Sequence, residues 1–245
     1  MDLISSSTGG VGDRMKNGLK EAWRYLTDWE AVPNSTDPIR FMGGDRINFG
    51  QAPVGIEDNS SLSSKLVWPE AFIQRFQSTI LCSYRTAIPS DDAQELSSDV
   101  GWGCMLRTCQ SLLANTLIRL GMEPLDVLDS FLDSSSCPFS IQAIQKAGYD
   151  LHHKEMGSWF GPSTAGAALQ RLVNEREGPP KLKVLLDQDQ VIYQDQVMQL
   201  AKSGDNWTPI LILVATRLGI NQVNPLYFER LKVGRAVTNS KGTRS

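Results

Sequence analysis

The spacing of hydrophobic positions changes along this chain and predicts helices first and strands later. In the earlier part, apolar residues recur every three or four positions, as on the buried face of a helix. This spacing predicts helices over residues 68–84, 104–120, 124–131, 140–148 and 165–173. Later apolar runs are short and continuous, and they predict strands over 181–186, 191–193 and 210–215, with one more helix over 225–231. Helices followed by strands indicate an α+β domain.

The two ends of the chain lack this patterning. Residues 1–35 are expected to form a flexible segment with one short amphipathic helix over residues 20–29. The residues that follow are rich in Pro, Gly, Asp, Asn and Ser, and they predict loops with a short strand over 39–42. Residues 233–245, after the last expected helix, show no amphipathic pattern. The patterned domain therefore spans residues 36–232.

The stretch from Ser97 to Gly121 places a cysteine between a tight turn and a helix. Two glycines flank Trp102, Cys104 follows at once, and leucines then recur at helical spacing. The first turn of a helix presents unpaired N–H groups and a partial positive charge, which favour a thiolate over a thiol. The glycines leave room for a substrate chain, and the Cys104 N–H could help to hold an oxyanion. Cys104 is a candidate nucleophile; the alternative is a buried structural thiol.

Composition and charge narrow the function classes. The 245 residues carry a net charge of -3 with a pI near 5.5, whereas nucleic-acid-binding domains usually carry a basic excess. The most apolar run, residues 209–215, is far shorter than the roughly 18 residues of a membrane span. The N-terminus lacks the basic-then-apolar pattern of a signal peptide. We therefore expect a cytoplasmic protein with no nucleic-acid partner and no transmembrane segment.

The cysteines and histidines do not form a metal-binding pattern. No Cys-x-x-Cys pair occurs among the 4 cysteines, and the only histidines are the adjacent His152 and His153. A structural zinc site or another cofactor is therefore not expected, and disulfides are uncommon in a cytosolic protein. Cys82 and Cys109 each lie in an apolar helical pattern, which predicts buried structural thiols.

Several stretches of the chain resemble the autophagins, the cysteine endopeptidases that process the ubiquitin-like modifier of autophagy. The strongest is Ser98–Arg107, Ser-Asp-x-Gly-Trp-Gly-Cys-Met-Leu-Arg, which is similar to the family's nucleophile segment. The papain signature itself does not occur. The resemblance covers residues 37–232. Further similar stretches are Asp37–Gly44, the pair Tyr84-Arg85, Met156–Thr164 with its Trp-Phe-Gly-Pro string, and Arg217–Tyr227 with its Arg-Leu-Gly string.

The resemblance implies a papain-like α+β fold and a thiol protease of autophagy. It implies that Cys104 is the nucleophile, that Tyr84 helps to form the oxyanion site, and that Trp159 lies beside the substrate groove under a regulatory loop. The expected partners are the ubiquitin-like modifier and its phosphatidylethanolamine conjugate, with membrane contact at most peripheral, through the lipidated substrate. The expected reactions are C-terminal processing of the modifier and its release from the lipid, in the cytoplasm. From the residues alone, packing roles are favoured for both Tyr84 and Trp159.

The sequence departs from the family at the partners of the thiol. The autophagins carry a catalytic Asp and His in an Asp-Pro-His motif beyond the Arg-Leu-Gly segment. No Asp-Pro-His occurs in this chain, and its only Asp-Pro is Asp37-Pro38. We therefore expect a chain truncated before that motif, with a fold incomplete at its C-terminal end and a poorly activated thiol. His152 or His153, oriented by Asp150, is the one alternative base.

Two alternatives to an active protease remain at this stage. A truncated form without a base could still hold the modifier, which would make the chain a non-catalytic binding module. A redox sensor could use Cys104 and Cys109, but residues five apart on a helix do not face each other. Thiol labelling separates these readings, because only a sensor forms a reversible bridge between the two cysteines.

Overall fold

The chain divides into two units, which are described separately. The structure, a computed structural model, describes residues 33–49 except 34, 43 and 45, and residues 67–88, 96–179, 181–187, 191–203, 206–219 and 222–228. The first unit comprises residues 1–79 and 230–245, and the second comprises residues 80–229. The helix expected over residues 20–29 and the tail expected over 233–245 lie outside the described residues.

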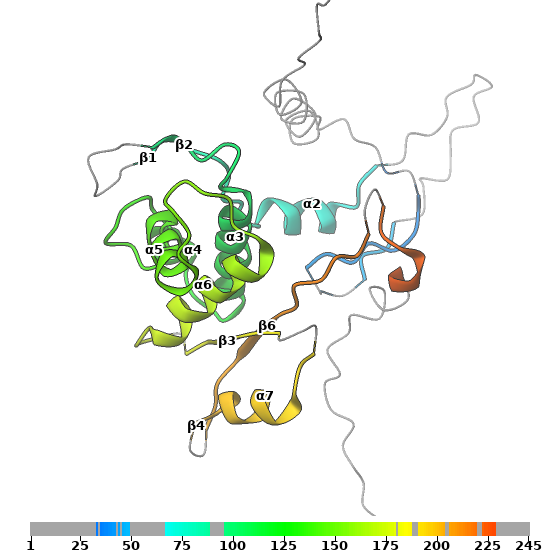
Figure 1. Ribbon diagram of the computed structural model, residues 1–245. Helices are drawn as coiled ribbons and strands as arrows, with labels where there is room; N and C mark the ends of the chain where they lie inside the picture. The colour runs from blue at the N-terminus through cyan, green and yellow to red at the C-terminus, as the bar shows by residue number, and fades with distance from the viewer. Residues whose placement is uncertain are drawn as a thin grey trace, which may run out of the picture. The chain divides into compact units, whose positions relative to one another are not determined.

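In the first unit, helix α2 (Glu70–Gln77; Figure 1) is joined to an earlier segment by aromatic contacts. The rings of Phe41 and Phe72 meet edge to face, with centroids 5.7 Å apart. Such pairs contribute about 0.5–1.5 kcal/mol beyond the area that they bury. The strand expected around Phe41 is reduced to a single antiparallel bridge between Ile39 and Ile47.

Helix α2 ends well before the C-terminal limit that the spacing predicts. The hydroxyls of Ser78 and Thr79 donate to the carbonyl of Arg75 at 2.9 and 3.0 Å, and such local bonds compete with the helical ladder. In the second unit, the Asn115 side chain binds both the N–H and the C=O of Ile80, at 3.1 and 2.8 Å. Because the backbone groups of Ile80 bind a side chain, they do not take part in a helical hydrogen-bond ladder. The hydrophobic spacing does not reveal this tertiary contact.

Helices α3 to α6 form the core of the second unit (Figure 1). Their bounds are Cys104–Arg119, Pro124–Asp129, Ile141–His152 and Pro162–Glu175. Helix α6 packs on α5 and α3. Burying one large apolar side chain contributes roughly 1.5–3 kcal/mol, so these contacts are the main stabilising term. The fully buried side chains of this hydrophobic core include those of Leu106, Leu113, Ile144, Phe160 and Leu169.

Helix α5 continues past Gly148, where the sequence predicted its end. His153 closes the helix instead, in the left-handed conformation (φ 52°), and its N–H donates to the carbonyl of Tyr149 at 2.8 Å. A Cβ at Gly148 would lie 2.2 Å from the Phe160 ring. Glycine is needed here for close packing rather than for a helix end. The contact fixes Phe160, and with it the neighbouring Trp159, relative to α5.

Strands β3 (Lys183–Leu186) and β6 (Ile210–Leu213) pair in parallel, as Figure 1 shows. The strands predicted at these positions are confirmed. A parallel pair needs a crossover connection, and helix α7 (Gln194–Ala201) lies within it. The sequence predicted a strand over 191–193 in this region and missed the helix. Val197 and Leu200, both half-buried, give α7 its apolar side.

Shorter elements complete the second unit. β4 (Lys202–Ser203) and β5 (Asn206–Trp207) form a small antiparallel pair. The helix predicted over residues 225–231 is a single 3-10 turn, Pro225–Tyr227, among the described residues. The second unit thus combines a helical core with short parallel and antiparallel strands, and the α+β class predicted from the sequence is confirmed.

An antiparallel hairpin brings the Tyr84 region to the nucleophile turn. β1 (Thr86–Ile88) pairs with β2 (Leu96–Ser98), and Thr86 lies opposite Ser98. The hydrophobic spacing predicted no strand over residues 96–98, so β2 was missed. Strands of three residues carry too little alternation to be recognised by periodicity. The pairing places residue 85 beside residue 99, at the entrance to α3.

Candidate active site

Cys104 is the first residue of α3, and a tight turn precedes it. The N–H groups of Trp102 and Gly103 both donate to the carbonyl of Asp99, at 3.3 and 2.8 Å. Gly101 adopts a φ of 97°, which side chains rarely tolerate. The Cys104 side chain is partly exposed. The thiol therefore lies at a helix N-terminus, where unpaired N–H groups and the helix dipole favour negative charge.

Gly103 is required because the turn is closely packed. A Cβ at this position would lie 2.7 Å from the Asp99 Cβ and 2.9 Å from the Asp99 carbonyl oxygen. The Trp102 indole is fixed as well, since its Nε1 donates to the carbonyl of Ser98 at 3.0 Å. The two glycines thus serve different purposes: Gly101 supplies a left-handed residue, and Gly103 allows close approach.

Tyr84 lies near Cys104 in the structure. Its side chain is 41% exposed. The pKa of the Tyr84 hydroxyl is raised, first by partial burial and then by the negative charges of the Cys104 thiolate and the Asp99 carboxylate. The N–H of the next residue, Arg85, donates to Asp99 Oδ1 at 2.7 Å, which places the Tyr84 segment beside the turn that carries Cys104. The raised pKa keeps the Tyr84 hydroxyl protonated and able to donate at neutral pH.

Asp99 and Arg107 form a buried ion pair directly beneath the turn. The Arg107 Nε donates to Asp99 Oδ2 at 2.5 Å, and the two side chains are 3% and 0% exposed. The backbone N–H of Arg85 donates to the other Asp99 oxygen at 2.7 Å. Burial alone would lower the pKa of Arg107, but hydrogen bonds to Asp133 and Asp99 outweigh it and raise that pKa. The guanidinium is therefore always charged.

Trp159 lies on the surface, immediately before α6. Its side chain is 53% exposed, whereas the neighbouring Phe160 is fully buried. A residue half-exposed beside an anchored neighbour suits a groove wall better than a core position. Among the described residues, no hydrogen bond or ion pair joins Trp159 to Cys104 or Tyr84, so its place in the groove stays a prediction.

The two histidines do not reach the thiol through any hydrogen bond among the described residues. His152 ends α5, His153 caps it, and both are exposed. The Asp150 carboxylate, considered as their orienting group, faces Arg171 instead, with Nη1 to Oδ2 at 3.4 Å. His153 contacts the ring of Tyr149 edge to face. Among the described residues, the contacts of these histidines are therefore local to the end of α5 and do not include Cys104.

Two of the other thiols, those of Cys82 and Cys109, differ from Cys104 in burial, whereas Cys137 is partly exposed like Cys104. Cys82 and Cys109 are both buried, as the sequence predicted. Burial raises the pKa of Cys109 from 9.0 to about 11. Burial also raises the pKa of Cys82, although a hydrogen bond with Ser111 opposes the shift. Because the thiolate is the reactive species, these two cysteines are weak nucleophiles at neutral pH.

This difference predicts the order of alkylation. Iodoacetamide at pH 8 should modify Cys104 before Cys109 and Cys82, and the Cys109 rate should keep rising with pH up to about 11. Site-resolved mass spectrometry over a time course measures the order. The same raised pKa means that the unfolded chain binds fewer protons above pH 9, so stability should fall as pH rises from 9.0 towards 11. Faster modification of Cys109 than of Cys104 would contradict the described burial.

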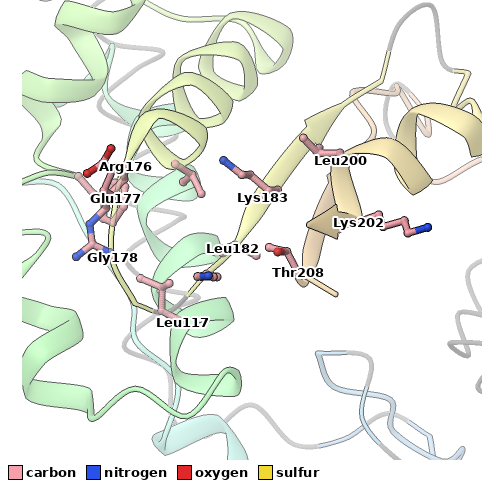
Figure 2. Close-up of a pocket in the computed structure, with 12 residues that line it drawn as sticks. Leu117, Arg176, Glu177, Gly178, Leu182, Lys183, Leu200, Lys202 and Thr208 are labelled. Atoms are coloured by element: carbon pink, nitrogen blue, oxygen red, sulfur yellow. The ribbon is translucent and has the colours of Figure 1, made fainter. Parts of the chain in front are cut away.

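A cavity of about 430 Å³ lies at the far end of α3 (Figure 2). Leu117 lines it, thirteen residues beyond Cys104 and therefore about 20 Å away along the helix axis. One of its cations, Lys183, donates from Nζ to the carbonyl of Asn174 at 2.8 Å, near the end of α6. Cations stabilise helix C-terminal ends, which explains why Lys183 lies at this edge of the cavity. The cavity is separate from the thiol site.

Two further features of the described residues bear on function. In these parts of the chain, no helix combines the length and apolarity that crossing a bilayer requires. No group of three or more His, Cys, Asp or Glu side chains within the same residues could hold a metal ion. The four cysteines are free thiols. The candidate chemistry therefore centres on Cys104.

The fold and the site define a class of protein. An α+β chain with a partly exposed cysteine at a helix N-terminus, in a turn hydrogen-bonded to the segment that carries Tyr84, suits a cysteine peptidase. Comparison with known families matches residues 69–243 to the Peptidase C54 catalytic domain. The chain belongs to this peptidase family, and the predicted resemblance to the autophagins is confirmed. The match continues beyond Lys232, where we expected the resemblance to end.

Fungal relatives agree with the family. The chain is 35% identical over 211 residues to "Probable cysteine protease atg4" of Botryotinia fuckeliana, which covers 71% of this chain and 48% of the relative. The protein of the same name from Sclerotinia sclerotiorum gives the same identity and coverage. That of Aspergillus niger is 34% identical over 215 residues, 73% of this chain and 53% of the relative. The chain thus spans about half the length of these relatives.

Proposed function

We propose that this protein is a cysteine endopeptidase of autophagy, acting in the cytoplasm. Its substrates would be the C-terminus of the ubiquitin-like autophagy modifier and the conjugate of that modifier with phosphatidylethanolamine. The observation that carries the proposal is the position of Cys104, partly exposed at the N-terminus of α3, in a turn to which the Tyr84-Arg85 segment is hydrogen-bonded through Asp99. Family membership and the names of the relatives support the reaction class.

The residues of the site suit nucleophilic catalysis. The Cys104 thiolate attacks the carbonyl carbon of a glycine near the modifier's C-terminus, and a tetrahedral oxyanion forms. The Tyr84 hydroxyl and the Cys104 N–H donate to that oxyanion. The C–N bond breaks, and the leaving amine takes a proton from solvent water. A second water then hydrolyses the thioester to the glycine carboxylate and the free Cys104 thiol. Trp159 would contact the substrate chain beside the scissile bond.

A second candidate is a chain that binds the modifier without cutting it. The observation that favours it is the placement of His152 and His153, which are exposed at the end of α5 and have no hydrogen bond to Cys104. A thiol without a general base is a weak peptidase, because proton transfer contributes about 10²–10⁴-fold to the rate.

The test is a trimming assay with a matched variant. The purified chain is incubated with a C-terminally extended modifier, and the products are weighed by mass spectrometry. We expect trimming that Cys104→Ala abolishes and that Cys109→Ala leaves intact, because only Cys104 is placed for attack. Vesicles carrying the lipid conjugate test release in the same way. Binding of the modifier without trimming would favour the second candidate, and the absence of both would contradict the proposal.

A further inference from the structure

Four charged side chains join three separate segments beneath the candidate site. The Arg107 guanidinium donates to both oxygens of Asp133, Nη1 to Oδ1 at 3.0 Å and Nη2 to Oδ2 at 3.2 Å. The Arg85 Nη1 donates to the same Asp133 Oδ2 at 3.0 Å. Arg107 also pairs with Asp99. Residues of the hairpin, of α3 and of the turn after α4 therefore share one network.

The network is balanced in charge and largely withdrawn from water. It contains two guanidinium groups and two carboxylates. The Asp133 side chain is 12% exposed and that of Arg85 is 39% exposed, whereas Arg107 and Asp99 are almost fully buried. Inside a protein, hydrogen-bonded ion pairs of this kind hold a fixed geometry, because breaking one contact leaves a buried charge without a partner.

The network fixes the backbone next to Tyr84. The N–H of Arg85 donates to Asp99 Oδ1 at 2.7 Å, and its carbonyl accepts from the Ser98 hydroxyl at 3.1 Å. The Arg85 side chain is held by Asp133 alone among the described residues. Tyr84 is the residue immediately before this anchor. Its position relative to Cys104 therefore depends on both ends of Arg85.

We propose that Asp133 is a positioning residue of the active site: by bridging Arg85 and Arg107, it holds the Tyr84 segment against the turn that carries Cys104. The inference rests on the proposed roles of Tyr84 and Cys104. Asp133 belongs to none of the sequence stretches that resemble the family's motifs. It touches neither the thiol nor the phenol, and it acts through the two arginines.

The test measures how strongly Tyr84 senses Cys104. The tyrosines are labelled with ¹³C at Cζ, the Tyr84 signal is assigned with Tyr84→Phe, and its titration is followed by NMR. Because the thiolate charge contributes to the raised pKa of Tyr84, Cys104→Ser should lower the titration midpoint. In an Asp133→Asn background, we expect this decrease to shrink by about half or more. The loss of the Asp133 charge also shifts the Tyr84 midpoint directly. This shift is the same with and without Cys104→Ser, so it cancels when the two decreases are compared.

Two further variants make the result decisive. Arg85→Gln removes only the contact of a partly exposed side chain with Asp133. With this variant, Cys104→Ser should lower the Tyr84 midpoint by less than in the parent chain, and this result can be obtained even if Asp133→Asn unfolds. Arg171→Gln removes a guanidinium of similar exposure from its surface pairs with Asp150 and Glu175, and it should leave the decrease unchanged. An unaltered decrease in Arg85→Gln and Asp133→Asn, or no decrease in the parent chain, would overturn the inference. A chain that shows the coupling but trims no substrate would contradict only the proposed function.

Discussion

Replacing Arg107 with methionine is expected to lower the free energy of unfolding by about 3–5 kcal/mol, because it leaves a buried charge without its partner. Asp99 is fully buried and would keep only the Arg85 N–H for its carboxylate. Asp133 would keep only the Arg85 guanidinium. Methionine fills much of the arginine volume, so the loss reports the missing charge rather than a cavity.

Chemical denaturation of Arg107→Met beside the parent chain measures this loss. The matched control is Arg171→Met, which removes an arginine that pairs with Asp150 and Glu175 at the surface. Exposed pairs contribute about 0–1 kcal/mol, so the control should change little. Equal losses in the two variants would show that the buried network does not stabilise the second unit beyond an ordinary surface pair.

The long helices were predictable because their buried face repeats within the segment itself. The spacing of Leu106, Leu113 and Leu117 predicts α3, and all three are buried in the core. The non-helical backbone at Ile80 was not predictable, because it is bound by the side chain of Asn115, thirty-five residues away. The same limit applies to Gly148, where glycine packs under Phe160 inside a helix and the sequence suggested a helix end.

The candidate site also combines features that are local in sequence, which could be predicted, with features that depend on distant contacts, which could not. Cys104 could be recognised because the turn and the helix that place it are local in sequence. The nearness of Tyr84 followed only from the family resemblance, since it depends on a hairpin whose strands of three residues leave no periodic signal. Asp133 could not be found at all. An isolated Asp in a Ser-rich turn has no pattern, and its importance comes from two arginines far away in the chain.

The nucleophile turn offers the second large effect, in Gly103→Ala. The added Cβ would lie 2.7 Å from the Asp99 Cβ and 2.9 Å from both Asp99 Oδ2 and the Asp99 carbonyl oxygen. Asp99 cannot retreat, because Arg107 and the Arg85 N–H hold its carboxylate. The turn must therefore move, and Cys104 moves with it. Overpacking of this kind costs about 1–3 kcal/mol.

Displacement of the thiol should affect reactivity more than stability. A misplacement of about 1 Å can cost roughly 100-fold in a reaction that depends on orientation. We therefore expect Gly103→Ala to slow the labelling of Cys104 by a modifier with a C-terminal electrophile about 100-fold, while labelling by iodoacetamide, which needs no alignment, changes far less. For stability, the control is Gly161→Ala, whose Cβ would make an ordinary 3.7 Å contact with the Trp159 ring. Equal slowing of both reagents would mean that the turn controls exposure of the thiol rather than its alignment with the substrate.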